Sequence, residues 1–478
     1  MQSGGLWMLV LLAFGTAFSG VPVWALLIGV SSAAAFVGVQ TGAFDLQVLG
    51  AMPVRVMGLL ESDILQALPL YVFVGLLLQR LSVAQALLAV LTRFFAWFFR
   101  SAAAGKAMAA LGLGALIAPM NGSVASSASM LTRLLQPQLQ GVDPARSSAW
   151  VSAASTIGVV VPPSLVLILL GDAMMRAHTE ATNMPGFVLQ AAHIINTQDV
   201  FHAALLPAFA VLLLWGWVIR RQSGRGGAAL PAVSKQQTAM AVCAVVFITG
   251  LLWAVFAGRL FAVEAAASAC MLLMAYALLA RALTWSQWRE LLLQSLGLSG
   301  ALMALLVGAT VFSLVFRLWG TDVWLTQAML SSPMPKPLTA ALVLLCVGLC
   351  AWVLDAFEMI FVIIPIVAPP LIAMLADAQQ VAVLLLLVLQ LSFLLPPMGY
   401  AVMLVRTSMA PGLRNAALLR ALLPFLMAQV LVIGAVFFVP AAVHQLDATV
   451  TAEAEGDAPE TEAQLIQRMQ EMTQPAKP

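Results

Sequence analysis

Two short stretches built on paired prolines decide the fold of this chain: Val159-Val160-Val161-Pro162-Pro163-Ser164 and Phe393-Leu394-Leu395-Pro396-Pro397-Met398-Gly399. Both lie inside otherwise apolar sequence. Because paired prolines remove two backbone donors, each stretch interrupts a helix wherever it falls. An interruption within lipid exposes polar backbone unless that backbone lines a cavity or is buried against protein. The two stretches therefore predict two broken helices held inside a larger membrane protein.

The composition supports the same fold class. Of the 478 residues, 62% are hydrophobic and only 9% are charged, whereas globular proteins average about 25% charged residues. A helix crosses a bilayer with about 20 apolar residues, and such runs recur along the sequence. The clearest are 240–257, 261–280, 338–354, 381–395 and 422–439. We predict an all-α polytopic membrane protein with about ten to twelve spans.

A second interruption precedes each proline pair by about 40 residues. In the first half it contains Asn121, Gly122 and Ser123, and in the second half it contains Asp355. One such pair could reflect the ordinary abundance of Pro and Gly in membrane helices. The matched order in both halves instead predicts two inverted repeats, each with a re-entrant hairpin and a Pro-Pro-broken helix.

The charge pattern divides the chain into four regions. The basic cluster between spans at 220–235 belongs in the cytoplasm by the positive-inside rule. We expect a first repeat half with the N-terminal spans at 1–219, a basic cytoplasmic linker at 220–238, a second repeat half at 239–442 and an acidic, solvated tail at 443–478. The first apolar run, 6–30, is too long for a signal-peptide core, so we expect it to span the membrane uncleaved.

The breaks could bind ions. A helix interrupted at mid-membrane presents free N–H groups that attract an anion and free C=O groups that coordinate a cation such as sodium. Short oxygen ligands lie beside the first breaks, although Ser and Gly also let membrane helices pack closely. We assign packing to 126–129 and 147–148, and ligation to Ser123, Ser155 and Thr156. Two interpretations of Asp355 stay open, a residue at the mouth of a hairpin or an interfacial helix cap.

Enzymatic motifs are missing from the sequence. The four histidines have no metal-ligand spacing, no Gly-rich phosphate loop follows a strand, and no G-x-S-x-G occurs. We therefore predict that the chain is not an enzyme and needs no organic cofactor. Without a P-loop it cannot hydrolyse ATP itself, so a concentrative carrier would need an ion gradient or a separate ATPase.

The stretch from Ser155 to Asp172 resembles the signature of the large membrane subunit of tripartite ATP-independent periplasmic (TRAP) transporters. The stretches 308–317, 355–370 and 390–400 resemble the second half of that family, and the likeness runs in consistent order from about residue 69 to about residue 411. The amino-acid sequence around Asp172, Gln390 and Phe393 is most similar to the branch of the family associated with 2-oxo acids, mannitol and chloroaromatic compounds.

The resemblance implies a function and its partners. The chain would be the large permease of a bacterial inner-membrane (cytoplasmic-membrane) system that imports a small organic anion, a carboxylate such as a 2-oxo acid, with sodium as coupling ion and an elevator motion. It would pair with a small four-helix membrane subunit, receive substrate from a soluble periplasmic binding protein and have no nucleic-acid partner. By the same resemblance the sodium and substrate sites would include Asn121, Gly122, Ser123, Ser155, Thr156, Gly158, Pro162, Pro163, Ser392, Pro396, Pro397 and Gly399, to which the intramembrane carboxylate of Asp355 is added from the sequence itself.

The sequence departs from the family pattern in the second half. Leu391 and Leu395 stand where threonines are expected, and Val388 stands in place of an Asn. We therefore expect an intact cation site in the first half and a weakened one in the second. The alternatives are a stand-alone ion-coupled anion transporter or antiporter of similar repeat architecture, a polytopic membrane enzyme, and a degenerate relative that acts as a scaffold without transporting.

Overall fold

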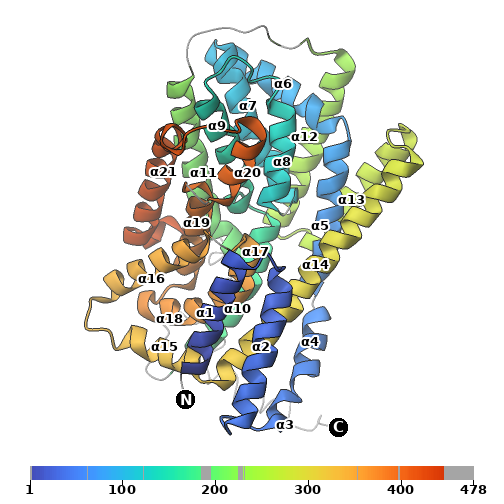
Figure 1. Ribbon diagram of the computed structural model, residues 1–478. Helices are drawn as coiled ribbons and strands as arrows, with labels where there is room; N and C mark the ends of the chain where they lie inside the picture. Colours follow the sequence, from blue (N-terminus) through green and yellow to red (C-terminus); the bar gives the residue numbers. More distant parts are fainter. Residues whose placement is uncertain are drawn as a thin grey trace, which may run out of the picture.

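The computed structural model describes residues 3–61, 63–121, 123–184, 195–223, 230, 232–352, 354–396 and 399–445, and every regular element within these ranges is a helix (Figure 1). The all-α prediction is therefore confirmed. Gly122, Pro397 and Arg225 lie outside the described residues, and so does most of the predicted acidic tail.

The first repeat starts with six helices that lead to the first hairpin and the first broken helix. Helix α6 packs against α7 and α12 at the upper end of the molecule (Figure 1). The helices are α1 (Ser3–Phe18), α2 (Val23–Gln40), α3 (Leu46–Leu49), α4 (Met52–Leu60), α5 (Asp63–Arg80), α6 (Val83–Phe99), the hairpin α7 (Ala102–Asn121) and α8 (Val124–Leu135), the broken pair α9 (Pro144–Val160) and α10 (Leu165–Thr182), and α11 (Thr197–Gln222).

The second repeat follows the same order. Its hairpin contains one turn of π-helix, η1, and its broken helix is the pair α19 and α20. The elements are α12 (Lys235–Phe256), α13 (Ala262–Leu279), α14 (Trp285–Leu318), α15 (Thr321–Leu330), α16 (Lys336–Cys350), α17 (Ala356–Glu358), η1 (Met359–Ile363), α18 (Ile364–Leu375), α19 (Ala378–Leu394), α20 (Tyr400–Met409), α21 (Asn415–Phe438) and the 3-10 turn η2 (Pro440–Ala442).

A constant offset of 234 residues relates the two hairpin-and-break units. It takes α9 onto α19 from first residue to last, and it takes the first residue of α7 onto the first residue of α16. Asn121 at the end of α7 corresponds to Asp355 at the start of α17, and Pro162 corresponds to Pro396. The backbone interruptions of the two halves thus occur at equivalent positions, as an internal repeat requires.

Membrane-crossing helices are fewer than expected. The described residues contain eight helices that are long and apolar enough to cross a bilayer, or up to ten if each of two bent pairs is one span. The expectation of ten to twelve therefore holds only at its lower limit. The reason is that apolar runs such as 338–354 and 381–395 form short hairpin or half-helix arms, α16 and α19, and not full spans.

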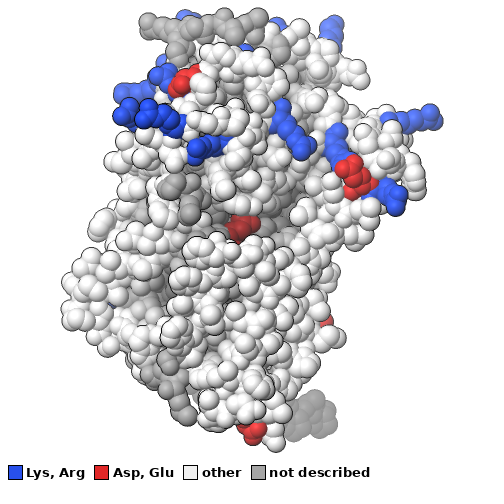
Figure 2. Space-filling model, viewed as in Figure 1, with Lys and Arg blue, Asp and Glu red and all other residues white. Residues whose placement is uncertain are grey.

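The helices fall into an exposed set and a buried set. Only 17% of the apolar window of α12 and 22% of those of α2 and α13 are buried, against 67% for α7. Helices α9 and α19 are buried along nearly their whole length. Exposed apolar helices suit contact with lipid or another membrane protein, and the buried set forms the centre where the breaks lie. On the face shown in Figure 2, Lys and Arg gather over the upper part of the molecule.

Candidate functional site

The first hairpin and the first break form two turns of non-helical backbone beside one another. Ser123 precedes α8 in an extended conformation, and Ser164 does the same for α10. Between α9 and α10 the Pro162-Pro163 peptide bond is cis, and the two half-helices are bent by 43°. Both prolines are buried within the protein, as interrupted backbone in lipid requires.

A small cavity lies between these two turns, and four serines line it. Its volume is about 10 Å³, which leaves room for about one water or one bare monovalent ion. Gly158 and short apolar side chains complete the wall. The four serines are Ser123, Ser127, Ser155 and Ser164.

The hydroxyl hydrogens of two of these serines point to backbone carbonyls. Ser155 Oγ donates to Ser152 O at 2.8 Å, and Ser164 Oγ donates to Val159 O at 3.3 Å. A hydroxyl has one hydrogen and two lone pairs. With the hydrogen used elsewhere, the oxygen can offer a lone pair to the cavity, and hard cations bind such oxygen ligands. The arrangement suits a small cation better than an anion.

Gly158 lets α9 approach α7 at this point. A Cβ on Gly158 would lie 2.5 Å from the carbonyl carbon of Ala118 and 2.8 Å from the nitrogen of Pro119, which is closer than packed atoms tolerate. A Cβ on Gly114, one turn before Ala118 on α7, would overlap the carbonyl oxygen of Ala154. The cavity therefore depends on glycine at the crossing of the two helices.

Equivalent residues of the two repeats meet in the buried centre. Thr156 and Gln390 each lie six residues before the first proline of their break, and Gln390 Nε2 approaches the Thr156 carbonyl at 3.5 Å. Gln429 of α21 donates to Gln390 Oε1 at 2.7 Å and to Leu387 O at 3.2 Å. All three side chains are fully buried. The Thr156 hydroxyl itself donates to Ala153 O within α9.

The second hairpin places a carboxylate at its turn. Asp355 precedes α17 and forms a capping box with Glu358, whose Oε2 accepts the Asp355 N–H at 3.0 Å. Asp355 is therefore both a hairpin-turn residue and a helix cap, so the two interpretations of it do not exclude one another. Its Oδ1 is buried and has no hydrogen-bond partner among the described residues. Figure 2 shows acidic atoms in a hollow at the height of α17.

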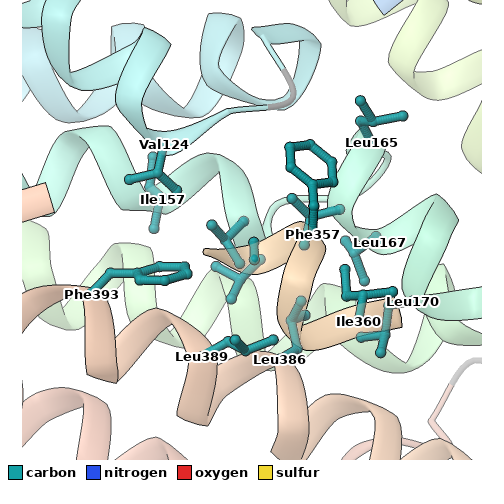
Figure 3. Packing of buried hydrophobic residues seen from close by; sticks show 14 of the residues in the cluster. Val124, Ile157, Leu165, Leu167, Leu170, Phe357, Ile360, Leu386, Leu389 and Phe393 are labelled. Carbon is teal, nitrogen blue, oxygen red and sulfur yellow. The ribbon is translucent and has the colours of Figure 1, made fainter. Parts of the chain in front are cut away.

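The rest of the second unit is apolar where the first is polar. By the offset, Ser123 and Ser155 correspond to Phe357 and Leu389, which pack among buried side chains from both repeats (Figure 3). Ser392 donates to Val388 O at 2.9 Å within its own helix. Pro396 ends that helix, and Gly399 approaches the carbonyl oxygen of Phe393 so closely that a Cβ would lie 2.7 Å from it.

The predicted site residues therefore separate into groups. Three line the small cavity, namely Ser123, Ser155 and Gly158. Thr156, Pro162 and Pro163 adjoin it without lining it, and Asp355, Ser392, Pro396 and Gly399 belong to the second unit. The side chain of Asn121 lies outside the described residues, as do Gly122 and Pro397.

Two lining residues were not predicted as ligands: Ser127, which was assigned to helix packing, and Ser164. Ser127 follows Ser123 by four residues and so shares its helix face, a signal that was available in the sequence. Ser164 directly follows the proline pair. Nearby Ser126 accepts from Gln79 Nε2 at 2.5 Å, a contact that packs α8 against α5.

Comparison with known proteins gives a consistent result. Residues 6–442 match the family described as "Tripartite ATP-independent periplasmic transporter, DctM component". The isethionate TRAP transporter permease protein DctMQ of Oleidesulfovibrio alaskensis is 23% identical over 70% of this chain, and the match spans only 51% of that longer relative. The C4-dicarboxylate TRAP transporter large permease protein DctM of Pseudomonas aeruginosa is 24% identical over 70% of this chain and 76% of its own length.

A solved structure shares the fold. The crystal structure of the Alcanivorax borkumensis YdaH transporter, described as having an unusual topology, superposes with a TM-score of 0.54 and 13% identity. The match covers 83% of this chain and 88% of that one. At this identity the likeness concerns the arrangement of helices alone.

Proposed function

The chain belongs to the DctM family of tripartite ATP-independent periplasmic transporters, and on that premise we propose that it imports a small organic anion together with sodium. It is a multi-pass protein of the inner membrane. DctM components work in systems that also contain a small membrane subunit and a periplasmic binding protein. We propose that this chain has both partners, the small subunit with four helices.

One observation carries the sodium assignment: the cavity of about 10 Å³ lined by serine oxygens at the first hairpin and break. It is too small for an organic anion and has room for about one ion. The hydroxyl hydrogens of Ser155 and Ser164 are used by backbone carbonyls, and Ser164 Oγ also accepts from the Leu167 N–H at 3.2 Å, so each oxygen keeps at least one lone pair for a cation. A bound cation would tie the hairpin α7–α8 to the broken helix α9–α10.

The substrate class is proposed from the relatives. Their names give isethionate, a sulfonate, and C4-dicarboxylates, which are all small organic anions. We propose a carboxylate, and a 2-oxo acid in particular because of the sequence likeness around Asp172 and Gln390. Sodium bound at the first unit would offset the negative charge of the substrate during its passage.

The proposed motion is of the elevator type. The hairpins and broken helices pack together as one buried group, while α2, α12 and α13 expose most of their apolar surface. A compact group that holds the cargo and an exposed group that contacts lipid are the two parts that such a motion needs. Each repeat contributes one hairpin and one break to the moving part.

Reconstitution tests the proposal. The chain is placed in liposomes with its small subunit, a periplasmic binding protein is added outside, and uptake of labelled pyruvate is followed with an inward gradient of sodium or of choline. We expect uptake with sodium only, and labelled succinate and isethionate serve as competing probes. Equal uptake rates with the choline gradient would remove sodium as the coupling ion.

A further inference from the structure

Three arginines surround one cavity on the side of the protein opposite the basic cytoplasmic end. The cavity has a volume of about 400 Å³ and lies between α4, α10, α14 and η1. Helix α10 is followed by α11, whose far end carries the Arg220 and Arg221 pair. The positive-inside rule places that pair in the cytoplasm, so the cavity opens toward the periplasm. By the same rule, arginine is less frequent on the periplasmic side, so three arginines around one periplasmic cavity indicate a function for them.

The charges of this cavity do not cancel. Arg176 pairs with Asp172 at 2.7 Å within α10, and Arg317 of α14 pairs with Glu180 of α10 at 2.5 Å. Arg55 of α4 also lines the cavity and forms no ion pair with the residues the structure describes. The lining therefore carries one positive charge in excess.

A neutral hydrogen-bond donor, the Ser313 hydroxyl, lies beside these arginines. Ser313 lines the same wall of α14, one turn before Arg317, and no partner of its hydroxyl occurs within the described ranges. A guanidinium presents up to five N–H donors in a planar fork, which suits the two oxygens of a carboxylate. Arg55, Arg317 and Ser313 together supply N–H and O–H donors on the wall of one cavity.

A neighbouring cavity limits where an anion can sit. It has a volume of about 520 Å³ and shares Glu180, Ser313 and Arg317 with the first. Asp322 lines only this second cavity, and one of its carboxylate oxygens is buried. The negative charge of Asp322 would repel an anion, so the favourable position is on the Arg55 side.

We propose that the cavity between Arg55, Arg317 and Ser313 is a periplasmic vestibule that binds the organic anion before it reaches the broken helices. This inference rests on the proposed function, because it takes the anion to be the cargo. The volume of about 400 Å³ holds a small carboxylate with water. A soluble anion is favoured over a lipid headgroup because the donors lie on two elements, α4 and α14, around a cavity and not on one outer helix face.

Glu180 competes with the incoming anion for Arg317. The ion pair joins α10 to α14, and each partner is about one third exposed, so it can open without leaving a fully buried charge. An anion that binds Arg317 releases Glu180, and removing Glu180 should therefore tighten anion binding. Removing Arg55 should weaken it. General surface charge would give the same two signs, so a distant arginine is needed as the control that identifies a specific site.

The test measures binding and not transport. The protein is held in phosphatidylcholine nanodiscs, arginines are modified with phenylglyoxal, and mass spectrometry reports how far pyruvate or succinate protects Arg317. We expect protection by both carboxylates and none by chloride at equal ionic strength. Arg55→Gln should raise the half-protecting concentration about fivefold, and Glu180→Gln should lower it about threefold.

Arg259→Gln is the matched control, since Arg259 is exposed in the turn between α12 and α13 and does not line the cavity. It should leave protection unchanged. The vestibule is wrong if Arg259→Gln weakens protection as much as Arg55→Gln, if Glu180→Gln has no effect, or if protection requires phosphatidylglycerol in the nanodisc. None of these results would contradict sodium-driven uptake in liposomes. The proposed anion site and the proposed sodium coupling can therefore be disproved independently of each other.

Discussion

The hairpin-and-break units of the two repeats share a backbone plan and differ in chemistry. The first encloses a small cavity lined by four serines. By the offset, Phe357, Phe361 and Leu389 of the second unit correspond to Ser123, Ser127 and Ser155 of the first. Figure 3 shows Phe357 and Leu389 packed among apolar side chains. Interrupting a helix is therefore not enough to make a cation site, because the surrounding side chains decide whether oxygen or hydrocarbon fills the gap.

The second unit carries two carboxylates at its hairpin turn. Asp355 corresponds to Asn121 by the offset, so a neutral amide in the first hairpin is a carboxylate in the second. Glu358, the other carboxylate of that hairpin, accepts the Asp355 N–H at 3.0 Å, so both acidic groups lie at the turn. The second unit thus concentrates its charge at the hairpin turn, and the first spreads hydroxyls over hairpin and break.

The largest effect is expected at the close crossing of α7 and α9 in the first unit. Gly158→Ala places a Cβ against the backbone of Ala118 and Pro119, so we expect a loss of about 1–3 kcal/mol of stability and nearly complete loss of uptake. Thermal unfolding in detergent and uptake in liposomes measure both. Gly297→Ala is the control, because nothing lies within 4 Å of its added Cβ. Equal stability of the two variants would contradict the close crossing.

Removing the hydrogen bonds of Gln429 and Gln390 in the buried centre should have an intermediate effect on stability. Gln429→Leu removes the donor to Gln390 Oε1 and to Leu387 O, and leaving buried acceptors unpaired costs about 1–3 kcal/mol. Thermal unfolding of Gln429→Leu, Gln390→Leu and the double variant should show less than additive losses. Gln327→Leu, at an exposed position on α15, should change little. Strictly additive losses would mean that the two amides do not act together.

The smallest effect is expected in the second unit. Ser392 does not line the serine-lined cavity, so Ser392→Ala should shift the half-saturating sodium concentration for uptake less than about twofold. Sodium titration of pyruvate uptake checks this. A large shift would show that the second break also binds the coupling ion and that the two units are more alike than their side chains indicate.

The sequence predicted the interruptions well because they have local causes. Proline pairs end helices whatever surrounds them, and both α9 and α19 end just before their pairs. The hairpin turns were found through Asn121 and Asp355, which are polar residues inside apolar runs. The expected span count holds only at its lower limit because hydropathy alone does not distinguish a half-helix of 17 residues, such as α19, from a short full span.

Contacts between distant segments could not be predicted in the same way. The pair of Glu180 and Arg317 joins residues 137 positions apart, and no local pattern in the sequence links them. Ser164 joined the cavity only because the fold brings the break beside the first hairpin. Gly158 was predicted as part of the sodium and substrate sites, but its packing partner, the end of α7, became visible only in three dimensions.

The most direct measurement is the sodium dependence of pyruvate uptake by the Ser123→Ala/Ser155→Ala double variant beside Ser392→Ala. If the serine-lined cavity binds the coupling ion, the double variant should fold normally and need about tenfold or more sodium for half-maximal uptake, while Ser392→Ala behaves like the unaltered protein. An unchanged sodium requirement in a folded double variant would contradict the assignment of the ion to the first repeat.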